Sequence, residues 1–250
     1  MKNVILALTV IIFVACKKDK SSDSGSNSNN RVKTYTEDLT LAGGAHSIAT
    51  FTLSYDANGR VTGLIPAPPV DFKILYSYNT GINYSTELFN SNVLEIHEDV
   101  FYNSNSFLDS TFEYNDTKDT TTEKYFYNAN NQLIKTNEYV YSATTGPSLT
   151  NTITYSYDAD GNMVQSTGTD AITDLYEYYN DLFFTYPLIG PSDGSLLQKH
   201  HLIKTHSRVS SGYPAGSASF TYTFDDHNRM STEKSISDDS TVVLKTYTYY

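Results

Sequence analysis

The sequence predicts an all-β protein in which repeated β-hairpins form an open, twisted antiparallel sheet that can curl towards a half-barrel. Two observations carry this prediction. Aromatic and hydroxyl-bearing residues alternate with a period of two in several segments, and one short turn motif recurs along the chain. The composition agrees, because the 250 residues include 22 Tyr and 12 Phe, and aromatic residues favour strands.

Strict alternation of residue types indicates strands with one packed face and one polar face. No long segment has a clear helical stripe, and the best helix candidate, residues 174–184, fits an irregular strand as well. The clearest alternating segments are residues 51–55, 154–157, 220–224 and 247–249.

One turn motif separates the predicted strands. It consists of an aromatic residue, then Asp or Asn, then Gly or Asn four positions after the aromatic, and an apolar residue at the sixth position. A looser copy begins at Tyr102. The four clear copies supply the structural residues of the repeat: Tyr55, Asp56 and Gly59; Tyr127, Asn128 and Asn131; Tyr157, Asp158 and Gly161; and Phe224, Asp225 and Asn228.

Each residue type in the motif has a physical role. The aromatic ends a strand on the packed face, and the Asp or Asn side chain accepts hydrogen bonds from N–H groups of the turn. Gly or Asn supplies the positive φ that a tight hairpin needs. The apolar residue opens the returning strand. A hairpin cannot bury its own face, so each copy must pack beside its neighbours.

The N-terminus has the layout of a secretory signal, with Lys2 followed by an apolar run that ends at Ala15. This run is too short for a membrane-spanning helix, which needs about 20 residues. It ends in Phe-Val-Ala-Cys at Cys16, which resembles a bacterial lipobox, with Phe13 where Leu is usual. The resemblance implies that residues 1–15 are removed and that Cys16 carries the lipid.

Residues 16–30 are polar and of low complexity, which is typical of a flexible tether. Residues 31–250 then form the single β domain. Cys16 is the only cysteine, so its acylation leaves no thiol for disulfides, nucleophilic catalysis or zinc binding. We therefore expect an outer-membrane location through the lipid anchor, with the domain facing the periplasm or the cell surface.

The predicted domain is acidic. Of the 17 Lys and Arg and 28 Asp and Glu residues, four basic and two acidic ones lie in residues 1–30, which leaves the domain near −13. Such a surface repels phosphate backbones, so nucleic acid is excluded as a partner.

Metal and cofactor sites are not predicted. The turn after Tyr157 looks superficially like a calcium loop, but Met163 stands where an EF-hand has Gly and Thr169 stands where it has Glu. His200 and His201 face opposite sides of a strand, and a strand places His206 about 20 Å from His200, so one ion cannot join them. We expect these to be surface histidines.

The carboxylates are expected in turns and on solvated faces. No serine-hydrolase, zinc-protease or phosphate-loop motif is present, so no catalytic residue is assigned. The acidic groups considered are Glu95, Glu98, Asp99, Asp225, Asp226, Asp238 and Asp239.

The turn motif resembles the signature of YD repeats, also called RHS-type repeats. The chain resembles more closely the Bacteroidetes outer-envelope lipoproteins with degenerate YD-like hairpins than the large RHS proteins. These lipoproteins share its lipobox, its tether, a late Ser/Leu/Lys-rich segment (residues 194–199) and the YTYY ending (residues 247–250). The resemblance covers most of the chain from about residue 50 and implies no catalytic residues. The irregular spacing and short length depart from the closed shells of large RHS proteins, which favours an open sheet.

The sequence therefore predicts a lipid-anchored binding or structural module without catalytic activity, whose partners are the membrane, through Cys16, and an unknown protein or glycan. One alternative is a glycan-binding lipoprotein in carbohydrate uptake. Another is a glycoside hydrolase that uses a carboxylate pair. A binding module should expose a contiguous aromatic patch, a glycan binder should present coplanar rings, and a hydrolase should have a deep pocket lined by two acids.

Overall fold

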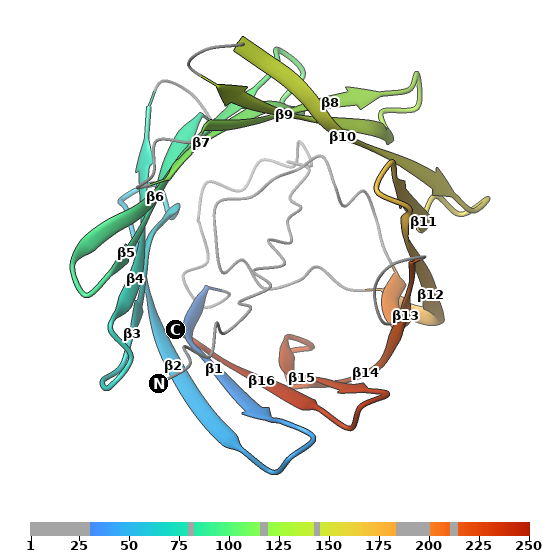
Figure 1. Cartoon of the computed structure of the whole chain (residues 1–250). Coiled ribbons are helices and arrows are strands. Elements are labelled where there is room, and N and C mark those ends of the chain that lie inside the picture. Colours follow the sequence, from blue (N-terminus) through green and yellow to red (C-terminus); the bar gives the residue numbers. More distant parts are fainter. Residues whose placement is uncertain (1–30, 80–82, 116–119, 143–145, 184–200, 211–214) are drawn as a thin grey trace, which may run out of the picture.

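In the part of the chain that the structure describes, sixteen antiparallel strands form one closed up-and-down barrel (Figure 1). The computed structural model describes residues 31–79, 83–115, 120–142, 146–183, 201–210 and 215–250. The strands are β1 (Val32–Thr40), β2 (His46–Tyr55), β3 (Val61–Pro66), β4 (Phe72–Tyr78), β5 (Tyr84–Asn90), β6 (Val93–Tyr102), β7 (Leu108–Asn115), β8 (Thr120–Tyr127), β9 (Leu133–Ser142), β10 (Gly146–Tyr157), β11 (Met163–Gly168), β12 (Ile172–Phe183), β13 (His201–Ser210), β14 (Gly216–Phe224), β15 (Met230–Ser237) and β16 (Val242–Tyr249).

The prediction of an open sheet is wrong, because β1 pairs with β16. Tyr35 lies opposite Tyr247 in this closing ladder, and the hydroxyls of Thr34 and Thr248 are 2.6 Å apart. Closure gives hydrogen-bond partners to the two strand edges that an open sheet would leave free. The turn motif predicts pairing only between strands that follow each other in the sequence, so it cannot predict whether the first strand pairs with the last.

The helix candidate at residues 174–184 falls within strand β12 as far as the structure describes it. The ladder between β12 and β13 is irregular after Glu177, which accounts for the weak alternation there. Residues 67–71 connect β3 to β4 and include a cis bond between Pro68 and Pro69.

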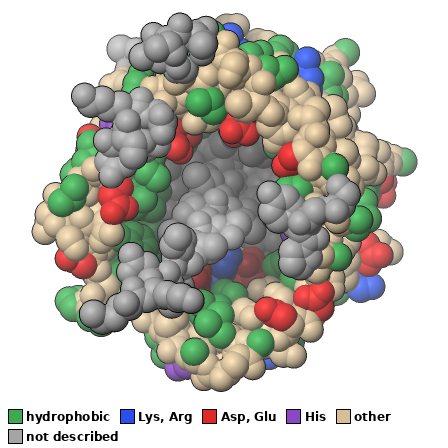
Figure 2. Space-filling view, in the orientation of Figure 1, with side chains coloured by type: hydrophobic (Ala, Val, Ile, Leu, Met, Phe, Trp, Pro, Cys, Tyr) green, Lys and Arg blue, Asp and Glu red, His purple; other side chains and the backbone are tan. Residues whose placement is uncertain are grey.

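Side chains alternate between the interior of the barrel and its outer surface. The buried face of the strands points inward: Tyr35 stacks with its cross-strand neighbours Phe51 and Tyr247, each at 5.6 Å between ring centroids. Leu53, Leu133 and Met230 are at most 1% exposed. Figure 2 shows hydrophobic and acidic side chains around the opening of the barrel. The packing that stabilises the fold therefore lies on the inner wall.

The five turns share one geometry. The Asp or Asn after the aromatic accepts hydrogen bonds from the N–H groups two and four residues later, as Asp56 does from Asn58 and Arg60, both at 2.9 Å. The residue four positions after the aromatic has a positive φ in every copy. These residues are Gly59, Ser106, Asn131, Gly161 and Asn228, with φ between 59° and 86°.

Tyrosine hydroxyls link successive turns around this end of the barrel. A Tyr in the second half of an even-numbered strand donates to a carbonyl at or near the start of the preceding odd-numbered strand, so both polar groups are satisfied where they are partly buried. In two places an arginine of the turn also covers the ring, as Arg60 does Tyr78 at 4.0 Å. The bonds are Tyr55–Val32, Tyr78–Val61, Tyr127–Leu108, Tyr157–Leu133, Tyr178–Met163, Tyr222–Ile203 and Tyr249–Met230, at 2.7–3.0 Å.

The substitution Gly161→Ala should destabilise the protein by roughly 1 kcal/mol, the cost of a left-handed backbone for a residue with a Cβ. Gly161 has φ 86°, and the nearest atom to an added Cβ is Gln132 Nε2 at 3.8 Å, so steric overlap adds nothing. Urea denaturation measures the change. Gly43→Ala is the control, because an added Cβ there meets nothing within 4 Å and no positive φ is involved. Equal effects at both positions would contradict the prediction.

Candidate functional site

The predicted repeat residues gather at one end of the barrel. Each clear copy joins an even-numbered strand to the next odd-numbered one, as residues 55–61 join β2 to β3 and residues 224–230 join β14 to β15. The Asp and Asn side chains are engaged in the turn, and Asp225 also holds Arg229 at 2.7 Å. These residues build the scaffold. Cys16, with the predicted signal and tether, lies outside the described residues.

A row of glutamates crosses the inner wall on β6 to β9. Glu98 lies directly opposite Glu113, and Glu123 lies directly opposite Glu138. Glu123 is also opposite Thr111, two residues from Glu113, so the two pairs are diagonal neighbours. Like charges in such positions repel each other. The inner wall formed by β6 to β9 therefore carries several neighbouring negative charges.

Glu123 lies between Glu113 and Glu138 in this row. Burial raises the pKa of its carboxyl group, and the charges of Glu138 and Glu113 raise it further, against a hydrogen bond donated by the Tyr125 hydroxyl. Sequence reasoning placed acids in turns and on solvated faces and missed this row. The signal was present, because Glu123 precedes the motif aromatic Tyr127 by four residues, and alternation places both on the same face.

A second interior cluster lies on β12 and β13. Asp174 Oδ1 is 2.8 Å from both His206 Nε2 and Arg208 Nε, and Arg208 Nη2 donates to Oδ2 at 3.1 Å. The ring of Tyr176 stacks on His206 at 4.9 Å. Burial alone would raise the pKa of Asp174, but the hydrogen bonds from His206 and Arg208 outweigh it and hold the pKa at about 2.

The histidines differ from the expected surface positions. His206 belongs to the Asp174 cluster, and its side chain is only 30% exposed. His201 is half-buried, with Nδ1 3.5 Å from Asn162 Nδ2. His200 lies outside the described residues. His206 bonds to Asp174, which is 32 residues away in the sequence. Sequence spacing therefore could not predict this contact.

On the side of the interior away from the glutamate row, charges are paired. Lys245 Nζ on β16 is 3.0 Å from Glu233 Oε1 on β15. Lys245 also lies opposite Glu37 on β1, whose carboxylate accepts a hydrogen bond from the Tyr35 hydroxyl. The inner wall is thus apolar and aromatic at the turn end and carries ionic groups further along the strands.

The outer surface of the barrel is rich in hydroxyl groups. Threonines on neighbouring strands bond to one another, such as Thr36 with Thr50 at 3.0 Å and Thr223 with Thr232 at 2.6 Å. Charged groups share this face, including the pair Asp38 and His46 at 2.7 Å. Apolar side chains such as Ile48 are scattered among them. Most of the outer wall therefore presents groups that water can hydrogen-bond.

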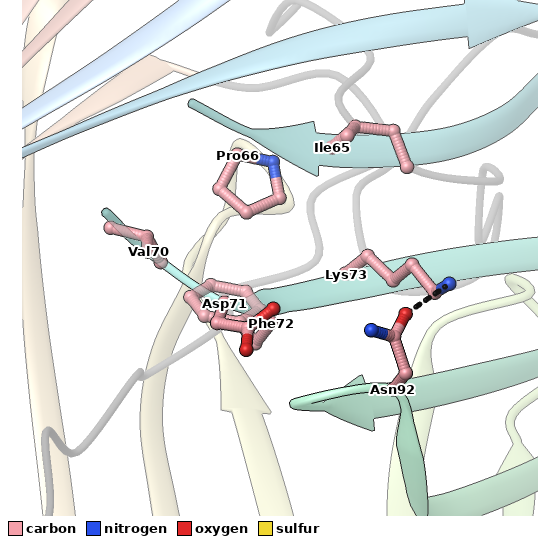
Figure 3. A pocket seen from close by; sticks show the side chains of 7 residues that line it. All are labelled: Ile65, Pro66, Val70, Asp71, Phe72, Lys73 and Asn92. Carbon is pink, nitrogen blue, oxygen red and sulfur yellow. Dashed lines mark hydrogen bonds between the residues drawn. The ribbon is translucent and has the colours of Figure 1, made fainter. Parts of the chain in front are cut away.

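A small cavity lies at the rim beside the β3–β4 connection (Figure 3). Its volume is about 110 Å³, whereas small-molecule sites measure about 300–1,000 Å³. Lys73 Nζ donates to Asn92 Oδ1 at 3.2 Å across it, and Asp71 is the one acidic residue in its lining. The cavity therefore offers no carboxylate pair. Its lining consists of Ile65, Pro66, Val70, Asp71, Phe72, Lys73 and Asn92.

One group of metal-ligating side chains occurs within the described part of the chain. Asp225, Asp226 and His227 bring one ligand atom each to within 4.8 Å of one another. The carboxylate of Asp225 is already used by the turn and by Arg229, and Asp226 and His227 are exposed and bond to each other at 2.7 Å. This arrangement is explained by the turn.

Across the described residues, no helix has the length and hydropathy needed to cross a membrane. The sequence matches no protein-family profile and no curated protein.

Among solved structures, the chain is similar to two porin-like proteins of Bacteroides. The porin-like protein from Bacteroides uniformis matches with a TM-score of 0.61 and 14% identity, over 89% of this chain and 98% of that chain. The porin-like protein from Bacteroides vulgatus matches with a TM-score of 0.59 and 12% identity, over 88% of this chain and 99% of that chain. These likenesses show the fold: an antiparallel all-β barrel of the kind found in both.

Proposed function

We propose that this chain is a lipid-anchored barrel of the cell envelope, which acts as a binding or structural module without catalytic activity. The polarity of the barrel wall carries the proposal. Hydroxyl and charged groups face outward and the packed core faces inward, whereas a barrel embedded in a bilayer presents an outward apolar band about 25 Å tall. Attachment to the outer membrane then comes from the lipid on Cys16.

A glycoside hydrolase has one observation in its favour, the raised pKa of Glu123 opposite Glu138. Burial is the largest cause of that shift, so it needs no catalytic role. A glycosidase also needs a cleft that holds a sugar between its two acids. The cavity in Figure 3 has a single acid and is smaller than a sugar site. The binding module is therefore the better-supported reading.

The substitution Cys16→Ser should remove the protein from the membrane fraction altogether, because it deletes the acceptor of the lipid. Fractionation of cells that produce the full-length chain measures this, and the released protein should stay in solution without detergent. Ser21→Ala, in the expected tether, is the matched control and should leave the protein in the membrane fraction. A Cys16→Ser protein that still sediments with membranes and needs detergent would point instead to a membrane-embedded pore.

A further inference from the structure

The expected tether joins the barrel at its turn end. Strand β1 begins at Val32, whose carbonyl accepts a hydrogen bond from Tyr55, the aromatic residue of the first turn. The carbonyl of Arg31 accepts the backbone N–H of Tyr250 at 3.1 Å, so the chain enters the barrel beside the end of β16. A lipid-anchored barrel is therefore held by its turn end, and the outer wall at that end lies nearest to the membrane.

The residue just before the motif aromatic points outward at this end, because the aromatic itself points inward. Three of the five copies of the motif have an exposed hydroxyl residue at this position, namely Ser54, Ser156 and Thr223. The two other copies have Phe101 and Phe126, which are 39% and 37% exposed. Phenylalanine thus replaces a hydroxyl on two hairpins that follow each other around the barrel.

In the first copy of the motif, this outward position belongs to a hydroxyl pair. Thr62, which follows the motif's apolar residue, donates to Ser54 at 3.1 Å, and the last copy has a pair of the same kind. The copy between β8 and β9 has Phe126 and Ile134 at these two positions, and Ile134 is 40% exposed. We call Phe101, Phe126 and Ile134 the apolar patch. Packing inside the barrel does not explain the apolar patch, because its side chains are outside and open to solvent.

Charged groups of both signs border the apolar patch. Lys135 Nζ lies 4.3 Å from the centre of the Phe126 ring, and Lys124 lies on the same outer face of β8. Asp109 is exposed on β7, the strand between Phe101 and Phe126. The patch therefore does not select a surface of one charge. Its mixed border fits headgroups that carry a phosphate and an ammonium group together.

The apolar patch lies across the barrel from the tether, since β1 and β8 are on opposite sides (Figure 1). Sixteen strands about 4.8 Å apart and tilted by about 40° form a barrel roughly 30 Å in diameter. A flexible chain of about 15 residues has an r.m.s. span of roughly 20 Å. A barrel that leans towards its β6–β9 side therefore brings the patch to the membrane, while a tether of this length still reaches the raised side.

We propose that the apolar patch rests in the headgroup layer of the membrane that carries the lipid anchor, against zwitterionic phospholipids. Phenylalanine and aliphatic side chains of peripheral proteins bury at the boundary between headgroups and acyl chains. Lysines beside them extend their ammonium groups back to the phosphates. The inference rests on the proposed function, because the anchor brings the patch to the membrane. Three side chains orient the barrel but do not hold an unanchored chain there, so the Cys16→Ser protein still stays in solution.

Quenching of a fluorophore by brominated phospholipids tests this contact. The acylated full chain is reconstituted into vesicles of phosphatidylcholine and phosphatidylethanolamine. Because Cys16 is the only cysteine and is acylated, an introduced cysteine is the single labelling site. We expect a label at Ser110→Cys, opposite Phe101, to be quenched at least twice as strongly as a label at Ser54→Cys, on the same end of β2.

The double substitution Phe101→Ser and Phe126→Ser gives the patch the residue type of the other copies and should remove this difference. Both side chains are exposed, so the thermal midpoint should stay within a few degrees of the parent's, which separates a lost contact from a lost fold.

The outcomes distinguish a failed patch from a failed anchor. Equal quenching of the two labels, or quenching that survives the double substitution, in protein that floats with the vesicles would overturn this inference alone. Protein that does not float with the vesicles would overturn the lipid anchor and the inference with it. Equally strong quenching of a label at Ile236→Cys, on the outer wall near the other end of β15, would indicate a barrel embedded in the bilayer and would overturn both as well.

Discussion

The substitution Leu133→Ala should lower the free energy of unfolding by about 3 kcal/mol, the middle of the range for truncating a buried leucine. Leu133 opens strand β9 after the third turn and is 0% exposed. Its carbonyl accepts the hydrogen bond from the Tyr157 hydroxyl, so the side chain packs where two turns are linked. Because the side chain is fully buried, its truncation leaves a cavity, which adds to the cost of the lost apolar contacts. In a chain of this size, the thermal midpoint should fall by about 6–12 °C.

The next residue provides a matched control. Ile134 is 40% exposed, since the ladder shifts register between Phe126 and Tyr127 and turns this side chain outward. Ile134→Ala should cost less than about 1 kcal/mol, the span of strand preferences. Thermal and urea unfolding of both variants gives the comparison. If the two substitutions cost the same, the assignment of the packed core to the inner wall is wrong.

The positions of Leu133 and of several strands could be predicted from the sequence. The motif position of Leu133, six residues after Tyr127, marked it as the start of a packed strand, and the structure has β9 begin there. The strand character of residues 51–55 and 220–224 followed from alternation and is confirmed. These features are local, because they depend on residues close together in the chain.

Closure of the barrel and the interior clusters could not be predicted in this way. The ladder between β1 and β16 joins Tyr35 to Tyr247, and no local pattern encodes that contact. The same holds for the Tyr hydroxyl bonds and for Asp174 with His206, which become neighbours only through strand register. The opposite orientation of Glu123 and Lys124 on β8 could be predicted, because adjacent residues of a strand face opposite sides of the sheet.

The substitution Asp174→Asn should destabilise the protein at pH 7 and remove part of its sensitivity to acid. The folded pKa of Asp174 is about 2, below the value near 3.9 of an unfolded aspartate. A lowered pKa means that the carboxylate contributes stability above pH 4–5, and that this contribution is lost as the pH falls through 4 towards 2. The shift corresponds to more than 2 kcal/mol, which screening by solvent reduces to about 1 kcal/mol.

Urea unfolding of the parent and of Asp174→Asn at pH 7, 4 and 2 measures this contribution. The difference between them should be about 1 kcal/mol at pH 7 and should become small near pH 2, because Asp174 of the folded parent is then about half protonated. Asp38→Asn is the matched control: its carboxylate also bonds a histidine, His46, but on the outer surface, where such pairs contribute little. A constant difference at all three pH values would mean that Asp174 acts through its shape rather than its charge, and the interior ion cluster would then be incidental to the acid stability of the barrel.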